Sequence, residues 1–365
     1  MTQISSIRTK ATIGGLQAMR AAMLYGIRDL KLEDISIPLL NSSDVLVKIK
    51  YVGVCGTDHA IYSGETSFVR NGLIKYPLIL GHEWSGVVES VGSEVSNFRP
   101  GDGVVGDSGV SCGKCVYCLN GSYYRCRQLQ AIGTINALDG AYAQFIAIPE
   151  RHLFMKPGNI SYEHASLAEP AATALYALDR AGLKAGDTVL IQGTGPIGLA
   201  AVNLAKIAGA CCIILTGRKD YKLGVGRMLG ADITVNVSEE DFYEKVMRAT
   251  GGDGVDKVIE ASGSLDAFQN SMNVMRYGGV FASLAFYEDM ADKFDIDKLV
   301  LRDITLMGIS GSPGRVPKVL NLMACGKLDI TPIITHIREL NEVQDVLSNF
   351  KHENEKKIKT LLKVD

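Results

Sequence analysis

The spacing of apolar and polar positions divides the chain into two stretches of different character. Between residues 21 and 150, short runs that alternate apolar and polar side chains are separated by Gly, Pro and Asp turns, as in DVLVKIKYVGV, SGVVESVGSEV and AYAQFIAIP. Such runs are typical of β-strands. We therefore expect an irregular, all-β domain here.

From about Ser161, helical spacing alternates with short apolar runs. The helical pattern of HASLAEPAATALYALDRAG is followed by a strand in DTVLIQG, a helix in IGLAAVNLAKIAG and strands in CCIILTG, DKVIEASG and GGVFASLAF. This alternation predicts a parallel, doubly wound sheet, so that the chain as a whole is α/β. The most apolar segment, 195–215, is interrupted by Asn203 and Lys206, which favours a buried helix and strand over a membrane span.

Beyond Ser310 the pattern predicts a helix in PKVLNLMACGK, a further helix and a last strand in KIKTLLKV. We expect these elements to return to the β domain. The predicted organisation is an N-terminal extension over 1–18, a β domain over 19–160 and 310–365, and a dinucleotide-binding domain over 161–309. Two domains suit 365 residues, at about 100–200 residues per domain.

Composition narrows the class of protein. A net charge of −2 and 7% aromatic residues give no sign of a nucleic-acid-binding face, and we expect neither nucleic acid nor a membrane as partner. Residues 1–18 lack the apolar core of a signal peptide, so the expected location is cytoplasmic. In that reducing compartment, clustered cysteines bind metal more often than they form disulfides.

Four of the eight cysteines fall within the stretch CGKCVYCLNGSYYRC. Their spacing suits four thiolates around one ion, and a closed tetrahedral zinc site of this kind stabilises a loop rather than catalysing a reaction. An iron–sulfur cluster is disfavoured because the last cysteine follows after seven residues and no proline comes next. The predicted structural zinc ligands are Cys112, Cys115, Cys118 and Cys126.

A glycine-rich turn follows the strand VLIQ and opens a helix. In GTGPIG, Gly193 would allow the tight turn, Gly195 the approach of a pyrophosphate, and Gly198 the packing of helix on strand. Pro196 and Ile197 begin the helix whose N-terminus attracts the anion. The motif in this context predicts a dinucleotide site, against the alternative of a glycine turn that binds nothing.

The next strand ends in LTGRKD, where an NAD-binding domain would offer an acid to the adenosine ribose. Gly217 takes that place, and Arg218 and Lys219 follow, which suits the 2′-phosphate of NADP. NADP is therefore favoured over NAD. The alternative is that Arg218 and Lys219 are solvated and that Asp220 or a backbone group holds NAD.

Catalytic chemistry is expected from Cys55 in VGVCGTDHA, His82 and Glu83 in LGHEWSG, and Glu169 in AEPAAT. A thiolate, an imidazole and a carboxylate are the ligands of an open, catalytic zinc site. Taken singly, each residue has an ordinary structural explanation, as a core cysteine, a turn histidine or a surface acid. Their joint appearance in these motifs favours the metal.

These motifs, with PGDGV at Pro100 and the cysteine cluster, resemble those of the zinc-dependent medium-chain dehydrogenase/reductase family, in particular its sorbitol (polyol) dehydrogenase-like branch. The resemblance runs from about Met19 to the C-terminus. It implies a GroES-like β domain, a Rossmann domain and a homodimer or homotetramer. It also implies catalytic zinc on Cys55 and His82, with Glu83 or Glu169 as a further ligand.

The resemblance also implies roles around the metal. Thr57 would accept the substrate's hydroxyl proton, Asp58 would hold His82, and Thr173 would lie near the nicotinamide. The family's relay histidine corresponds to Ala60, and His59 lies one residue earlier, where a helix turns the side chain by about 100 degrees. Arg302 is either a contact for polyol hydroxyls or a surface arginine at a helix end.

The leading hypothesis is a zinc-dependent, NAD(P)-linked dehydrogenase that oxidises a secondary alcohol of a polyol or sugar-like substrate to a ketone. A carboxylate ligand makes a harder, more polar zinc site, which suits a hydroxyl-rich substrate. Alternatives within enzymes are an aldose 1-dehydrogenase, a threonine-type dehydrogenase and a simple alcohol dehydrogenase. A non-enzyme alternative is a dinucleotide-binding redox sensor with structural zinc only.

Overall fold

The computed structural model describes residues 18–136, 138–290, 294–352 and 356–364, which divide into two compact units. The first unit comprises the described residues up to Ser166, Ile337–His352 and the chain from Leu361 onward, and the second comprises Leu167–His336 with the described residues up to Thr360. Of the predicted extension, residues 1–17 lie outside the described residues, and residue 18 begins the first strand.

The first unit is built on antiparallel pairs around β3 (Asp44–Gly53), the strand predicted from DVLVKIKYVGV. β5 (Glu83–Val91), β9 (Phe145–Pro149) and β18 (Lys359–Lys363) all pair with β3 in antiparallel fashion. β6 (Gly103–Gly106) and β10 (Leu153–Met155) extend this sheet, as does β17 (Ile334–Glu339), of which the residues from Ile337 onward belong to the first unit. The apolar run of β3 is therefore buried, with five of its residues fully enclosed: Val45, Leu46, Val47, Ile49 and Val52.

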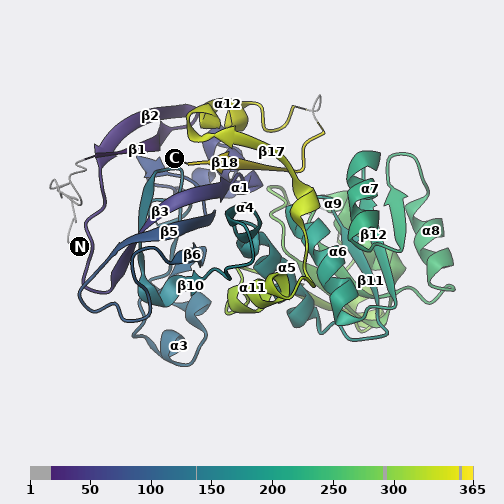
Figure 1. Cartoon of the computed structure of the whole chain (residues 1–365). Helices are drawn as coiled ribbons and strands as arrows, with labels where there is room; N and C mark the ends of the chain where they lie inside the picture. Colours follow the sequence, from purple (N-terminus) through teal and green to yellow (C-terminus); the bar gives the residue numbers. More distant parts are fainter. Residues whose placement is uncertain (1–17, 137, 291–293, 353–355, 365) are drawn as a thin grey trace. The chain divides into compact units, whose positions relative to one another are not determined.

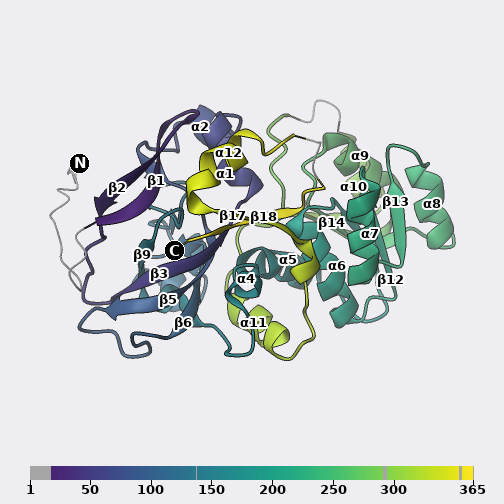
Figure 2. The same cartoon turned by 45° about the horizontal axis from the view of Figure 1, so that its top comes forward.

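Smaller elements complete the first unit (Figure 1). β1 (Ala18–Gly26), β2 (Asp29–Ser36) and β4 (Leu78–Ile79) form a second sheet, and β7 (Gly109–Val110) pairs with β8 (Gln130–Ala131). The helices are α1 (Gly56–Ser63), α2 (Ser67–Arg70), α3 (Val116–Leu119), α4 (Tyr162–Ala165) and α12 (Val343–Ser348). α1 and α12 lie side by side (Figure 2).

The second unit contains the predicted parallel sheet. Its strand order is β13-β12-β11-β14-β15-β16, and every pair is parallel. The strands are β11 (Thr188–Gln192), β12 (Cys212–Gly217), β13 (Ile233–Asn236), β14 (Val255–Glu260), β15 (Met275–Ser283) and β16 (Thr305–Gly308). The order reverses between β11 and β14, and ligands of such sheets bind beyond the strand ends at that point.

Helices precede, connect and follow these strands along the chain. They are α5 (Ala168–Ala181), α6 (Pro196–Ala208), α7 (Asp220–Leu229), α8 (Phe242–Ala249), α9 (Leu265–Val274), α10 (Asp297–Leu301) and α11 (Val316–Ala324). None of the helices in the described parts of the chain is long and apolar enough to cross a membrane. The α/β fold class, with one irregular β unit and one Rossmann-type unit, agrees with the prediction.

The return of the chain to the first unit occurs later than the predicted residue 310. Residues 310–336 belong to the second unit, and the first unit resumes at Ile337. The reason is α11, which buries Val316, Val319 and Leu320 and contacts α5 of the same unit. An amphipathic helix reveals from its sequence that it has a buried face, but not which neighbour covers it.

Candidate active site and metal centres

Three predicted zinc ligands of the first unit lie together. The ligand atoms of Cys55, His82 and Glu83 are all within 4.8 Å of one another. Strand register explains this, because Gly53 at the end of β3 pairs with Glu83 at the start of β5. Residues just beyond these two strand ends therefore face each other, although they lie far apart in sequence.

Backbone conformation fixes the two turns that carry the ligands. Cys55 is the N-cap of α1, and its N–H donates to Oδ2 of Asp58 at 2.9 Å. Gly81, just before His82, has a φ of 95°, and a Cβ there would lie 2.6 Å from the ring of Tyr142. Only glycine combines this backbone conformation with so close a neighbour.

The buried carboxylate of Asp58 orients the site. Its Oδ1 lies 3.4 Å from Nδ1 of His82, and its Oδ2 accepts a hydrogen bond from the hydroxyl of Tyr142 at 2.8 Å. Because Nδ1 faces Asp58, Nε2 is the ring nitrogen left to bind a metal. Tyr142 was not predicted from the sequence, since no local motif marks a tyrosine that contacts a residue 84 positions away.

Burial and neighbouring charges together shift the pKa values of His82 and Tyr142 in this site. Burial alone would lower the pKa of His82, but the negative charges of Asp58 and Cys55 outweigh it and raise the pKa well above its usual range. Burial and then the charge of Asp58 raise the pKa of Tyr142, so its phenol stays protonated and donates. A thiolate, an imidazole and a carboxylate around a site this rich in negative charge fit a divalent zinc ion.

The remaining predicted catalytic residues lie on two helices. Thr57 is half-buried in the first turn of α1. Glu169 belongs to the second unit, in the first turn of α5, where its Oε1 accepts a hydrogen bond of 3.4 Å from the hydroxyl of Thr173. Ligation of zinc by Glu169 and the position of Thr173 beside a nicotinamide stay predictions.

His59 and Arg302 have structural contacts. Nδ1 of His59 lies 2.9 Å from the carbonyl oxygen of Leu347, and its ring stacks on Phe350 with centroids 5.0 Å apart. His59 thus joins α1 to α12. Nη1 of Arg302 donates to three carbonyl oxygens around the end of α9, including that of Met275 at 3.1 Å. This contact favours the structural interpretation of Arg302 over a polyol contact.

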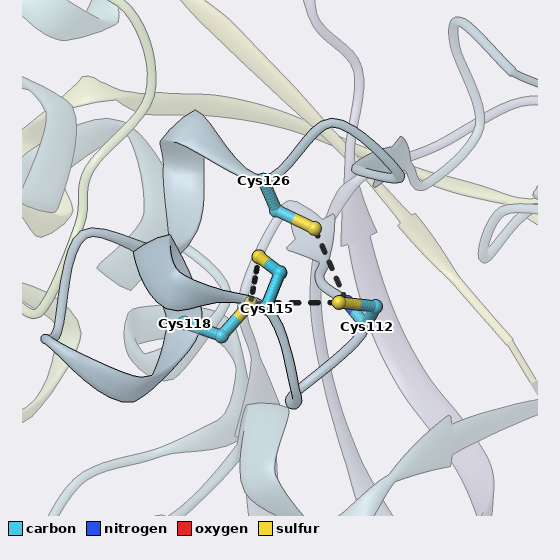
Figure 3. Close-up of side chains that lie close together, drawn as sticks. All are labelled: Cys112, Cys115, Cys118 and Cys126. Atoms are coloured by element: carbon cyan, nitrogen blue, oxygen red, sulfur yellow. Dashed lines mark hydrogen bonds between the residues drawn. The ribbon is translucent and has the colours of Figure 1, made fainter.

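The four clustered cysteines converge on one point (Figure 3). Sγ of Cys118 lies 3.5 Å from that of Cys115 and 3.9 Å from that of Cys112. The backbone N–H of Lys114 is the largest influence that lowers the pKa of Cys112, to about 6. The backbone of Cys118 acts to lower the pKa of Cys115, but burial and then the neighbouring thiols outweigh this effect and raise that pKa to about 11. Four cysteine sulfurs that converge on one point fit a single zinc ion.

A buried polar network holds this cysteine lobe, defined as residues 111–126, on the first unit. Nε2 of His152 accepts a hydrogen bond from the backbone N–H of Ser111 at 3.0 Å. Asp107 accepts hydrogen bonds from the hydroxyls of Tyr123 at 2.7 Å and Tyr124 at 2.5 Å. Since Nε2 accepts, the neutral His152 ring carries its proton on Nδ1, which faces Asp107 at 3.7 Å.

The glycine-rich turn lies at the point where the strand order of the second unit reverses. A Cβ on Gly193, with φ at 104°, would lie 2.9 Å from the backbone of Ala261 and Ser262, and one on Gly198 only 2.0 Å from the Gly193 carbonyl oxygen. A Cβ on Gly195 would meet nothing within 4 Å. Gly195 thus leaves open space at the N-terminus of α6, where Pro196 and Ile197 form the first turn. This cradle fits a dinucleotide pyrophosphate.

The end of β12 has no room for the acid that NAD-binding domains use. A Cβ on Gly217 would lie 2.6 Å from Cγ2 and 2.9 Å from Oγ1 of Thr194. Asp220, the alternative acid, accepts a hydrogen bond of 2.8 Å from Nδ2 of Asn236 at the end of β13. The sequence did not predict a role for Thr194, because that role follows from a contact between two different loops.

The parallel sheet with its glycine cradle, together with the metal-donor group of the β unit, defines a class: nucleotide-linked oxidoreductases that use a metal. Comparison with protein families agrees. The alcohol dehydrogenase GroES-like domain model matches residues 41–158, and the zinc-binding dehydrogenase model matches residues 196–325.

Individual relatives match along most of the chain. The sorbitol dehydrogenase of Bacillus subtilis (strain 168) is 33% identical over 92% of this chain and 96% of its own length. An L-threonine 3-dehydrogenase of Bacillus velezensis is 34% identical over 86% of this chain and 90% of its own. The chain therefore belongs to the zinc-dependent medium-chain dehydrogenase/reductase family, as its motifs predicted.

The fold comparison agrees with the family. A zinc-binding dehydrogenase of Sinorhizobium meliloti 1021, solved bound to NADP, superposes with a TM-score of 0.88 at 31% identity, covering 95% of this chain and 100% of the other. The likeness includes both units of the chain.

Substitution of Asp58 tests the orientation of His82. Asp58→Asn removes the charge that faces Nδ1, and we expect zinc affinity at the Cys55 group to fall by about 10–100-fold. Competition with a chromogenic chelator measures this affinity. Asp253→Asn, which changes an exposed acid of the second unit, is the control. Equal zinc affinity in Asp58→Asn and wild type would contradict the assigned role.

Removal of one thiol tests zinc binding by the cysteine lobe. We expect Cys115→Ser to bind one zinc ion fewer per chain and to unfold at a lower temperature, because a closed site contributes folding free energy. Elemental analysis and thermal unfolding measure the two effects. Cys325→Ser, at an exposed cysteine outside both donor groups, should change neither. An unchanged zinc content in Cys115→Ser would contradict the prediction.

Substitutions at two glycines of the cradle should affect different properties, cofactor affinity in one case and stability in the other. Gly195→Ala puts a methyl group into open space, so we expect cofactor affinity to fall by about tenfold with little change in stability. Gly198→Ala forces a methyl group onto the Gly193 carbonyl, which we expect to cost about 1–3 kcal/mol of unfolding free energy. Cofactor titration and urea unfolding test both. Equal destabilisation by the two changes would be inconsistent with this division.

Proposed function

We propose that the protein is an NADP-linked, zinc-dependent dehydrogenase that oxidises a secondary alcohol of a polyol or sugar-like substrate to a ketone, reversibly. The observation that carries the proposal is the convergence of Cys55, His82 and Glu83 in one partly buried group. A carboxylate beside the thiol makes a harder site than thiols alone, which suits a hydroxyl-rich substrate. Sorbitol dehydrogenase among the relatives supports the same substrate class.

In this proposal Cys55 and His82 hold the catalytic zinc, with Glu83 or Glu169 as a further ligand. When bound, zinc supplies Lewis-acid chemistry that polarises the substrate oxygen and lowers the pKa of the alcohol. Asp58 keeps His82 in the tautomer that presents Nε2, and Tyr142 keeps Asp58 in place through its hydroxyl. Thr57 accepts the hydrogen bond of the substrate's hydroxyl and relays the proton, giving up its own hydroxyl proton toward water.

NADP is the proposed cofactor. Thr194 occupies the space that a carboxylate at position 217 would need, and Arg218 and Lys219 offer positive charge to a 2′-phosphate. Gly195 leaves open space for a pyrophosphate, while Gly193 and Gly198 permit the tight turn and the close packing behind it. Thr173 would lie near the nicotinamide. Hydride transfer itself belongs to the cofactor's chemistry. We further propose a cytoplasmic homodimer or homotetramer, with structural zinc on the cysteine lobe.

The second candidate is a threonine-type dehydrogenase, which the similarity to L-threonine 3-dehydrogenase favours. The two candidates differ in product. A polyol gives a ketose, whereas threonine gives an aminoketone. A simple alcohol dehydrogenase or an aldose 1-dehydrogenase would instead give an aldehyde or a lactone.

Zinc content and turnover together test the proposed function. We expect two zinc ions per wild-type chain and one in Cys55→Ala, with kcat/KM for the best polyol reduced by at least about a thousandfold. Elemental analysis gives the first quantity, and a screen of polyols, L-threonine and simple alcohols with NADP and NAD gives the second. The lobe variant Cys115→Ser controls for loss of the other ion.

Two outcomes would contradict the proposal. One zinc ion in both wild type and Cys55→Ala, after zinc is added back, would leave a dinucleotide-binding protein with structural zinc only. Turnover of threonine with no turnover of polyols would replace the substrate class while the zinc assignment stands.

A further inference from the structure

Four cationic residues lie in the region of the first turn of α7, where the charges of three of them act on the fourth, Lys222. Arg218 and Lys219 follow the end of β12, and Lys219 is the N-cap of the helix. Lys222 lies one turn on, with its backbone N–H 3.0 Å from the carbonyl oxygen of Lys219. The fourth, Lys357, comes from the C-terminal part of the same unit. Sequence reasoning identified only the first two, because the others do not follow the strand directly.

A hydrogen bond holds the C-terminal segment against α7. The hydroxyl of Tyr221 donates to the backbone carbonyl oxygen of Lys357 at 3.0 Å, across 136 positions in sequence. The ring of the same tyrosine lies beside Lys222, whose Nζ is 5.9 Å from the ring centroid. Tyr221 therefore contacts the backbone of Lys357 and lies beside the ammonium of Lys222, the two lysines that the strand-end motif does not include.

The neighbouring positive charges shift the pKa of Lys222. Burial lowers the pKa of Lys222, and the positive charges of Lys357, Lys219 and Arg218 lower it further. The acid of this turn, Asp220, is engaged by Asn236 at 2.8 Å. A half-buried ammonium with three cationic neighbours is unfavourable by itself and is relieved by an anion.

We propose that Lys222 and Lys357 complete, with Arg218 and Lys219, the site for the 2′-phosphate of NADP, and that Tyr221 positions Lys357 in it. The inference rests on the proposed use of NADP and extends it to a segment distant from the Rossmann motif. A phosphate monoester carries about two negative charges and three acceptor oxygens, more than one arginine can satisfy. A flexible lysine from a second segment supplies a further donor.

Binding measurements on variants test this inference without turnover. Dissociation constants of NADPH and NADH, and of adenosine 2′,5′-bisphosphate as a probe without nicotinamide, are measured by fluorescence titration. We expect Lys357→Gln and Lys222→Gln each to weaken NADPH and the bisphosphate by about fivefold and to leave NADH unchanged. Tyr221→Phe keeps every charge and should weaken NADPH by about threefold, because Lys357 loses its anchor.

The control is Lys327→Gln, which removes an exposed lysine of the same unit and should leave all three dissociation constants unchanged. If wild type prefers NADPH but Lys357→Gln keeps the same NADPH-to-NADH ratio, the inference is wrong and the proposed cofactor stands. If wild type prefers NADH, both are wrong. If Lys357→Gln weakens the binding of NADPH and NADH equally, Lys357 contacts a portion of the cofactor that both share. That result would also overturn the inference.

Discussion

The buried carboxylate of Asp58 is the interaction on which the candidate active site depends. It accepts from the backbone of Cys55 and from Tyr142, and it faces His82. Burial alone would raise the pKa of this carboxyl, but the charge of His82 and these hydrogen bonds hold it below its usual value. A charge buried at this cost keeps its partners in one arrangement, because losing any of them would leave it poorly compensated.

Strand register makes that arrangement possible. The pairing of Gly53 with Glu83 brings two turns together that are widely separated in sequence, and each turn contributes a donor next to the strand end. A shift of one residue would turn alternate side chains to the other face of the sheet. The apolar residues of β3 that fill the core therefore also fix the geometry of the metal donors.

The two units preorganise their candidate ligand sites in different ways. In the second unit, backbone and glycine packing form the cradle, and the side chain of Thr194 crowds the position that a Cβ at residue 217 would take. In the first unit, side-chain donors with buried polar supports form the two candidate metal-donor groups, and the lobe is anchored through His152 and Asp107. Preorganised groups of this kind lower the free energy needed to order a site when a ligand binds.

The sequence by itself determined the features whose physics is local: the α/β class, the cysteine spacing, the glycine cradle and the donors Cys55, His82 and Glu83. Only the tertiary structure decided which distant residues meet. It moved residues 310–336 into the second unit, assigned Arg302 to the end of α9, and brought Tyr142 to Asp58 and Lys357 to Tyr221. The reason is physical, since local patterns encode backbone conformation and burial, whereas such contacts depend on how separate elements pack.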